Sequence, residues 1–167
     1  MTKRLANASF VTSIIGIDPG LDGGVALIAQ DGVSVFDTPT IQVKKSKREY
    51  AIPEMVRLLR DSGPARVIIE AVHSMPKQGV TSSFNFGKGY GLWLGITAAL
   101  GYPYDLVTPQ RWKSVMLDGM AKDKGASRVR AMQLFPLVSD HLARVKDEGR
   151  AEALLIAEYG RRLAVLQ

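Results

Sequence analysis

Three short apolar runs separated by turn residues constrain the fold of this chain more than any other feature. The runs span residues 10–17, 25–29 and 33–36. The first gap contains Gly20, Gly23 and Gly24, and the second contains Asp31-Gly32, a pair typical of tight hairpin turns. The start of the chain therefore predicts three strands in an antiparallel meander.

The rest of the chain alternates between strand and helix patterns. Apolar runs bounded by turn residues predict strands at 66–72 and 104–107. Helical spacing predicts helices at 52–59, 90–100, 109–116, 126–134 and 148–165. We expect exposed loops at 39–50 and 74–88 and a loose polar lead-in at 1–9. The order predicts one α/β domain over residues 1–167, with a mixed five-stranded sheet flanked by helices and the strands at 10–17 and 66–72 as neighbours.

The charge and the missing residue types restrict the chemistry. The 167 residues include 22 Lys and Arg against 16 Asp and Glu, a formal charge of +6, which favours a polyanionic partner. A basic domain without such a partner is the alternative. Cysteine is absent and there are only two histidines, so any metal must be held mainly by oxygen atoms. No apolar run reaches the roughly 20 residues that span a bilayer, so we expect no membrane segment.

Two carboxylates stand out because of the apolar strands that lead to them. Asp18 directly follows the run at 10–17, and Glu70 lies in the otherwise apolar run at 66–72. A carboxylate in such surroundings needs a bound cation, an Arg or Lys, or an opening to solvent. Because the two strands are expected to be neighbours, the pair indicates a functional site. The alternative is two ordinary carboxylates at strand ends.

A third carboxylate, Glu152, lies on the face of the last helix that is expected to pack on the sheet. Helical phase brings Glu148 to the same face, whereas Asp147 reaches it only from outside the helix and is a natural N-cap. The alternative is an amphipathic helix in which Glu152 pairs with a nearby cation. Carboxylates converging from two strands and a helix form a hard-oxygen site that suits Mg²⁺ or Mn²⁺. Two such ions about 3.5–4 Å apart can hold the attacking and leaving oxygens of a phosphodiester.

Four segments of the chain, taken in order, carry a resemblance to a known family. They are Gly-Ile-Asp-Pro-Gly at 16–20, Val-Ile-Ile-Glu at 67–70, Val-Thr-Pro-Gln-Arg-Trp-Lys at 107–113 and Arg-Ala-Glu-Ala-Leu-Leu-Ile-Ala at 150–157. Together they resemble the RuvC-type Holliday junction resolvases over nearly the whole chain, and residues 146–153 look closer to phage or prophage members. The resemblance implies a ribonuclease H-like fold, which agrees with the predicted strand order.

The resemblance implies catalytic roles for single residues. Asp18, Glu70 and Glu152 would be metal ligands, with Glu152 standing where the family usually has an aspartate. Lys113 and Lys124 would hold the scissile phosphate and stabilise negative charge in the transition state. The alternative for each lysine is a solvated surface position.

One position departs from the family pattern. Three residues before the terminal-helix acid the family has another acid or a histidine, and this chain has Gly149. Asp147 or Glu148 must then supply the fourth ligand. Overall similarity favours Asp147 as a catalytic metal ligand, and helical phase favours Glu148.

The resemblance also implies contacts with branched DNA and a homodimer. His73 stands where the family often has an aromatic residue that stacks on bases, and Lys122 is a rival of Lys124. The expected DNA-binding residues are His73, Lys77, Lys88, Lys113, Lys122, Lys124 and Arg128. A structural histidine or a solvated cation is the alternative for each. The helix at 92–100 is a candidate dimer face or part of the core.

The implied function is a structure-selective endonuclease that resolves four-way (Holliday) junctions and other branched DNA in recombination and repair. It would use two Mg²⁺ ions, for which Mn²⁺ can substitute, in the cytoplasm of a bacterial cell or phage-infected host. One alternative is a non-catalytic branched-DNA-binding module, which Gly149 favours and the three intact acids oppose. Another is an actin-like phosphotransferase domain, suggested by Asp-Pro-Gly-Leu-Asp-Gly-Gly at 18–24, but such enzymes need two of these domains.

Overall fold

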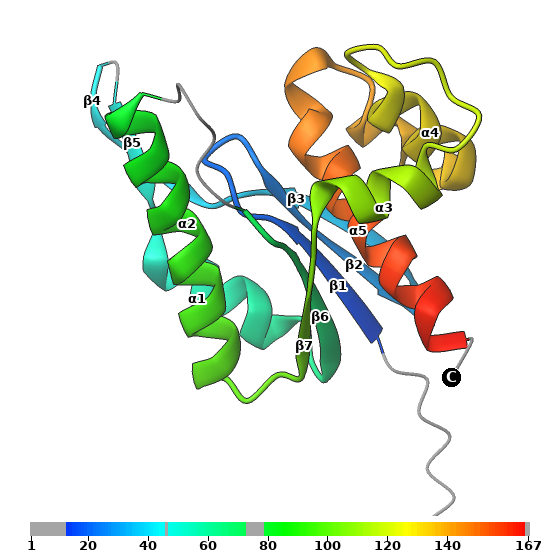
Figure 1. Ribbon diagram of the computed structural model, residues 1–167. Helices are drawn as coiled ribbons and strands as arrows, with labels where there is room; N and C mark the ends of the chain where they lie inside the picture. Colours follow the sequence, from blue (N-terminus) through cyan, green and yellow to red (C-terminus); the bar gives the residue numbers. More distant parts are fainter. Residues whose placement is uncertain (1–12, 46, 73–78, 166–167) are drawn as a thin grey trace, which may run out of the picture.

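A mixed five-stranded sheet forms the centre of the computed structural model, which describes residues 13–45, 47–72 and 79–165 (Figure 1). The strand order is β3-β2-β1-β6-β7. The strands are β1 (Ser13–Asp18), β2 (Gly24–Ala29), β3 (Gly32–Asp37), β6 (Ala65–Glu70) and β7 (Tyr104–Val107). The first three pair antiparallel, and β6 and β7 extend the sheet in parallel from β1. The predicted sheet, and the pairing of its first strand with the strand that carries Glu70, are confirmed.

Helices cover both faces of the sheet. One face carries α5 (Glu148–Val165), α3 (Pro109–Met116) and α4 (Ala126–Leu134), and the other carries α1 (Ile52–Asp61) and α2 (Val80–Ala99) (Figure 1). Two short 3₁₀ turns, at Pro136–His141 and Val145–Asp147, lead into α5. In the part of the chain that the structure describes, no helix is long and apolar enough to cross a membrane.

Strand alternation decides which face receives the acidic residues. Ile14 and Ile68 pack in the core under α5, whereas Ile17 and Ile69 pack in the core under α1 and α2. Side chains of a strand point to opposite faces in turn, so Asp18 and Glu70 project on the α5 side. Ile17 is the register partner of Ile69, and the two carboxylates therefore leave adjacent strands side by side.

Helix α5 lies directly on the backbone of β1 and β2. A Cβ atom at Gly16 would collide with the main chain of Ala153 and Ala157. A Cβ atom at Gly149 would collide with the carbonyl oxygen of Asp22, and Gly149 forms a backbone bridge with Gly23. The helix can approach this closely only because these positions carry no side chain.

The predicted loop at 39–50 is wrong. Strands β4 (Thr40–Lys44) and β5 (Lys47–Tyr50) form a separate antiparallel hairpin instead. Ile41 and Val43 alternate with polar residues, but both stay exposed, so the segment lacks the buried face by which a strand is recognised. Buried Tyr50 anchors the hairpin, since its hydroxyl lies 3.3 Å from the carbonyl oxygen of Pro19 and 3.2 Å from that of Asn85.

The predicted start of the second long helix is also wrong. Helix α2 begins at Val80, within the segment expected to be a loop, and residues 73–78 lie outside the described part of the chain. Gly87 and Gly89 lower the helix propensity of this stretch and hide its helical pattern. The glycine at 89 has a tertiary cause, because a Cβ atom there would collide with the ring of Tyr50.

Replacing Gly16 with alanine should lower the free energy of unfolding by about 1–3 kcal/mol, the usual cost of overpacking a core. The new methyl group would meet the backbone of α5 rather than a movable side chain. Urea unfolding followed by circular dichroism measures the difference. Gly20→Ala is the control, because its methyl group would lie 3.6 Å or more from its neighbours. Equal stability of Gly16→Ala and wild type would contradict the close packing of α5.

Candidate active site

Three carboxylates, on β1, β6 and α5, face one another at the carboxyl ends of β1 and β6. The pKa of Asp18 is raised to about 8, first by burial and then by the negative charges of Glu152 and Glu70. The backbone N–H of Gly20, 3.4 Å from Oδ1, and the ammonium of Lys113 lower it again in part. The structure therefore brings together the three acids that the sequence singled out, and it leaves them with an excess of negative charge.

Glu152 is held by two donors at the same oxygen atom. The Nζ atom of Lys113 lies 2.7 Å from Oε1, and the hydroxyl of Ser127 donates to Oε1 at 3.1 Å. The Glu152 side chain is only 17% exposed, so this carboxylate would be costly to bury without them. Burial works against the charge of Lys113, but Glu152, Glu70 and Asp18 together raise the pKa of its ammonium.

Glu70 is held by a neutral donor. The indole Nε1–H of Trp112 donates to Oε1 of Glu70 at 2.8 Å, and both side chains are buried. Burial raises the pKa of Glu70 above its ordinary range, and the Trp112 hydrogen bond offsets part of that effect. The ammonium of Lys113 lies 5.0 Å from the centre of the Trp112 ring. These two neighbouring residues of α3 bind different carboxylates, since Trp112 donates to Glu70 and Lys113 pairs with Glu152.

The donor set suits a hard divalent cation in type and charge. Carboxylate oxygens are the ligands that Mg²⁺ and Mn²⁺ prefer, and a cation would relieve the repulsion that raises the pKa of Asp18. Among the described residues no three acidic or imidazole side chains are yet gathered closely enough to hold a metal ion. Glu70 and Glu152 each have one oxygen engaged by a donor of α3, Trp112 for Glu70 and Lys113 for Glu152.

A cavity of about 890 Å³ opens beside Glu152, between α3, α4 and the start of α5. Its lining includes Lys113, Lys122, Lys124 and Glu148. Lys122 and Lys124 therefore border the same space, but Asp118 and Asp123 line it as well, so the cavity carries charges of both signs next to Glu152.

The fourth-ligand candidates lie in different surroundings. Asp147 is buried in the turn before α5, where it accepts hydrogen bonds from the backbone and the guanidinium of Arg144 at 2.9 Å. The hydrogen bond from Arg144 holds the pKa of Asp147 below its ordinary range. Glu148 instead lines the cavity with Glu152. Its partner is Arg128, whose Nε lies 2.9 Å away and whose Nη1 donates to the carbonyl oxygen of Ala143.

Of the three other residues expected to bind DNA, the structure describes one, which is not part of this cluster. Lys88 is exposed on α2, near Glu49 of the β4–β5 hairpin. His73 and Lys77 lie outside the described residues. Two site residues escape the sequence reasoning. Trp112 stands next to Lys113 in the segment at 107–113, which could have marked it, whereas nothing in the sequence distinguishes Ser127.

The chain shares its fold with solved structures of Holliday junction resolvases. No family model matches the chain. The solved structures that match are ribonuclease H-like α/β domains, which confirms the expected fold class. The chain has the fold of RuvC. A structure of Thermus thermophilus RuvC with a Holliday junction substrate matches with a TM-score of 0.66 and 17% identity, covering 93% of this chain and 96% of that one.

Two further matches agree with this fold. The yeast mitochondrial Holliday junction resolvase Ydc2 matches with a TM-score of 0.53 and 17% identity, covering 93% of this chain and 80% of that one. The chloroplastic Holliday junction resolvase MOC1 of Chlamydomonas reinhardtii is 33% identical over 91 residues, which are 54% of this chain and 10% of that protein. The chain thus spans about a tenth of the length of this curated relative.

The charge excess predicts that the protein in EDTA loses stability as the pH rises. Folded Asp18 keeps its proton up to about pH 8, whereas the unfolded chain releases it near the ordinary pKa of 3.8. Between these values the folded state binds more protons, so the free energy of unfolding falls with rising pH. Asp18→Asn lacks this effect. Its advantage over wild type should grow by at least about 1.4 kcal/mol, the equivalent of one pKa unit, between pH 5 and pH 8 in urea unfolding.

Glu158→Gln is a control, because its effect on stability is opposite in sign to that of Asp18→Asn. Burial opposes the charge of Glu158, but hydrogen bonds from Arg161 and Arg162 hold the pKa of this carboxyl below its ordinary range. Its stabilising contribution is therefore present at neutral pH and lost as the pH falls through the folded value. Glu158→Gln should be less stable than wild type at pH 7. An Asp18→Asn advantage that stays constant from pH 5 to pH 8 would contradict the repulsion within the site.

Proposed function

We propose that this protein is a metal-dependent endonuclease that cuts four-way DNA junctions and other branched DNA. The observation that carries the proposal is the cluster of Asp18, Glu70 and Glu152 with Lys113, on a fold shared with RuvC. The three carboxylates would hold two Mg²⁺ ions, or Mn²⁺ in their place. Bound there, the ions would activate water and neutralise charge on the phosphodiester. The cytoplasm of a bacterial cell or of a phage-infected host is the proposed place of action.

The residues of this chain have distinct tasks in that reaction. Asp18 and Glu70 supply the negative charge that binds the cations at the strand ends. Lys113 is drawn to the same point by Glu152 and would stabilise charge on the scissile phosphate. Lys124 and its rival Lys122 would hold the neighbouring phosphates along the cavity, since both line it. His73, Lys77 and Lys88 remain proposed contacts with the DNA.

Glu148 is the better candidate for a fourth acidic ligand. It borders the cavity with Glu152, which supports the assignment. Each acid pairs with an arginine, Asp147 with Arg144 and Glu148 with Arg128, but the Asp147 side chain is 1% exposed whereas that of Glu148 is 38% exposed. Arg128 is similarly engaged, by Glu148 and by the carbonyl oxygen of Ala143, which leaves it poorly suited to bind phosphate.

The proposal predicts paired nicks in a labelled four-way junction and none in a linear duplex of the same sequence. Cleavage should require Mg²⁺ or Mn²⁺, stop in EDTA, and fall at least about a hundredfold in Asp18→Asn, since the lost charge acts directly at the reacting centre. Gel shifts in EDTA check that Asp18→Asn still binds the junction. Tight binding without cleavage in any metal would instead establish a DNA-binding module. Failure to bind either DNA would contradict both the nuclease and the DNA-binding module, and nucleotide binding would then be tested.

A homodimer is also proposed, and the exposed face of α2 supports it. Gly87, Gly91 and Gly95 recur every four residues on that face, and a Cβ atom at each meets nothing within 4 Å. A glycine in a helix costs roughly 0.5–1 kcal/mol relative to alanine. No contact in the described part of the subunit requires glycine there, whereas a second α2 could approach closely along such a face. Val80 and Phe84, 87% and 71% exposed, extend the same face with apolar surface.

Gly91→Leu should separate folding from dimerisation. Leucine favours the helix and has open space in the subunit, so the thermal midpoint of the monomer should not fall. The side chain would keep a second helix at a distance, and the dimer dissociation constant should rise at least about tenfold in sedimentation velocity. Ser82→Leu, an exposed substitution on the opposite side of α2, is the control. A wild type that stays monomeric at micromolar concentrations would exclude the dimer.

A further inference from the structure

We infer that Trp112 is a positioning residue that fixes one oxygen of Glu70 and leaves the other for a divalent cation. The inference rests on the proposed function. Its basis is one contact, the 2.8 Å hydrogen bond from the indole Nε1–H to Oε1 of Glu70. Trp112 is fully buried, so no water competes for this donor.

The hydrogen bond divides the two oxygens of the carboxylate between two tasks. Oε1 is occupied by Trp112, and Oε2 has no hydrogen-bond partner among the described residues. Glu70 has three side-chain torsions, and its rotation is limited once one oxygen is fixed. Glu70 and Asp18 follow the paired Ile69 and Ile17, so the carboxylate that keeps Oε2 lies beside Asp18. A neutral donor achieves this without adding a positive charge that would compete with the cation.

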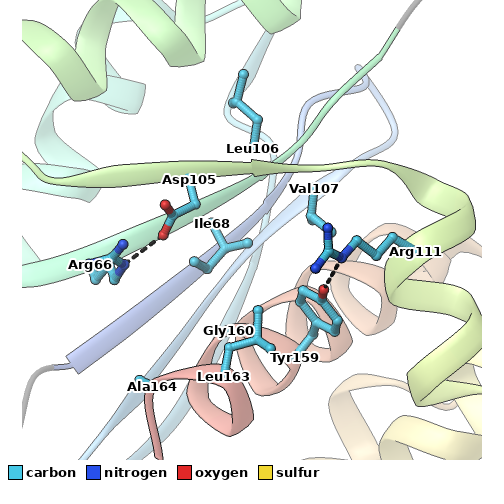
Figure 2. A pocket seen from close by; sticks show the side chains of 10 residues that line it. All are labelled: Arg66, Ile68, Asp105, Leu106, Val107, Arg111, Tyr159, Gly160, Leu163 and Ala164. Atoms are coloured by element: carbon cyan, nitrogen blue, oxygen red, sulfur yellow. Dashed lines mark hydrogen bonds and ion pairs between the residues drawn. The ribbon is translucent and has the colours of Figure 1, made fainter. Parts of the chain in front are cut away.

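Helix α3 is itself held firmly enough to act as the support. Thr108 caps its first turn by accepting the backbone N–H of Arg111 at 3.4 Å, and Pro109 follows the cap. The Nε–H of Arg111 donates to the hydroxyl of Tyr159 on α5 at 2.9 Å. Figure 2 shows this contact at one end of a pocket of about 300 Å³ between β7 and α5. The pocket is lined by none of the three acids.

Three consecutive residues of α3 therefore reach three different groups. Arg111 contacts Tyr159, Trp112 contacts Glu70, and Lys113 contacts Glu152. Because residues that follow one another on a helix point about 100° apart, the helix is fixed against rotation from three directions. Preorganisation of this kind is what a supporting shell contributes to a metal site.

The chain offers a matched control for Trp112. It contains two tryptophans, and the other, Trp93, is equally buried but its Nε1 has no hydrogen-bond partner among the described residues. Trp112→Phe and Trp93→Phe thus remove the same atoms from two buried sites, and only the first removes a donor to a carboxylate. Loss of packing is common to both variants, so the difference between them reports on the hydrogen bond together with the contact of the ring with Lys113, and benzothienylalanine at position 112 separates these two.

The test is Mn²⁺ binding to the dimer or monomer as purified, without DNA, from the electron paramagnetic resonance signal of free Mn²⁺. Trp112→Phe should raise the Mn²⁺ dissociation constant about 10–100-fold, the usual effect of removing a partner of a ligand, and Trp93→Phe should leave it unchanged. In Trp93→Phe the emission of the remaining Trp112 should change as Mg²⁺ is added. In Trp112→Phe the emission of Trp93 should not respond. Junction binding in EDTA should be equal in both variants.

The outcomes separate this inference from the proposed function. A wild type that binds no Mn²⁺ and cleaves no junction overturns the proposed function. A wild type that does both, with equal Mn²⁺ affinities for the two variants, overturns the role of Trp112 alone. If Trp112→Phe does not fold, benzothienylalanine placed at position 112 decides, because it keeps the shape of the indole and replaces its N–H with sulfur. An unchanged dissociation constant in that protein would refute the inference.

Discussion

The contact between the backbone of α5 and the backbones of β1 and β2 is the constraint on which the site depends. Where a helix normally rests on side chains, here Gly16 and Gly149 let main chain meet main chain. Such a contact leaves little freedom to slide or roll, since any shift brings backbone atoms into collision. Arg150 adds a second restraint, with both of its hydrogen bonds to Asp37 of β3 measuring 2.6 Å. The position of Glu152 above Asp18 is therefore set by the scaffold and not by a ligand.

That rigidity is needed because burying three carboxylates close together lowers the stability of the folded protein. Three partly or fully buried carboxylates share one nearby ammonium, and burial together with their mutual repulsion raises the pKa of Asp18 to about 8. The remaining partners, the indole of Trp112 and the hydroxyl of Ser127, are neutral. They orient the carboxylates without cancelling their charge. Bound cations would relieve this repulsion, so the proposed function accounts for an arrangement that by itself lowers the stability of the metal-free protein.

The sequence predicts those parts of the molecule in which a local pattern and the tertiary environment agree. The meander, the strand ending in Glu70 and the helices on the α5 face follow from apolar periodicity, and Asp18, Glu70 and Glu152 stand out as acids in apolar surroundings. The hairpin at 40–50 is missed because Ile41 and Val43 have no core to face. The first turns of α2 are missed because Gly89 is required by contact with Tyr50, not by the helix. Ser127 is missed because a contact between α4 and α5 leaves no periodic signal.

The glycine at 149 acquires a different meaning once the packing is known. From the sequence, its presence where related proteins have an acid or a histidine favours a site that has lost its function. In the structure, any side chain at 149 would collide with the carbonyl oxygen of Asp22. A metal-binding side chain at that position is therefore incompatible with the close packing of α5 on the sheet. A decayed site would leave the other acids without their supporting contacts. Here Glu70 and Glu152 keep theirs, and Glu148, one residue away from the glycine, borders the same cavity. The glycine at 149 and the close packing of α5 therefore belong together, and the glycine by itself is no sign that the site has lost its function.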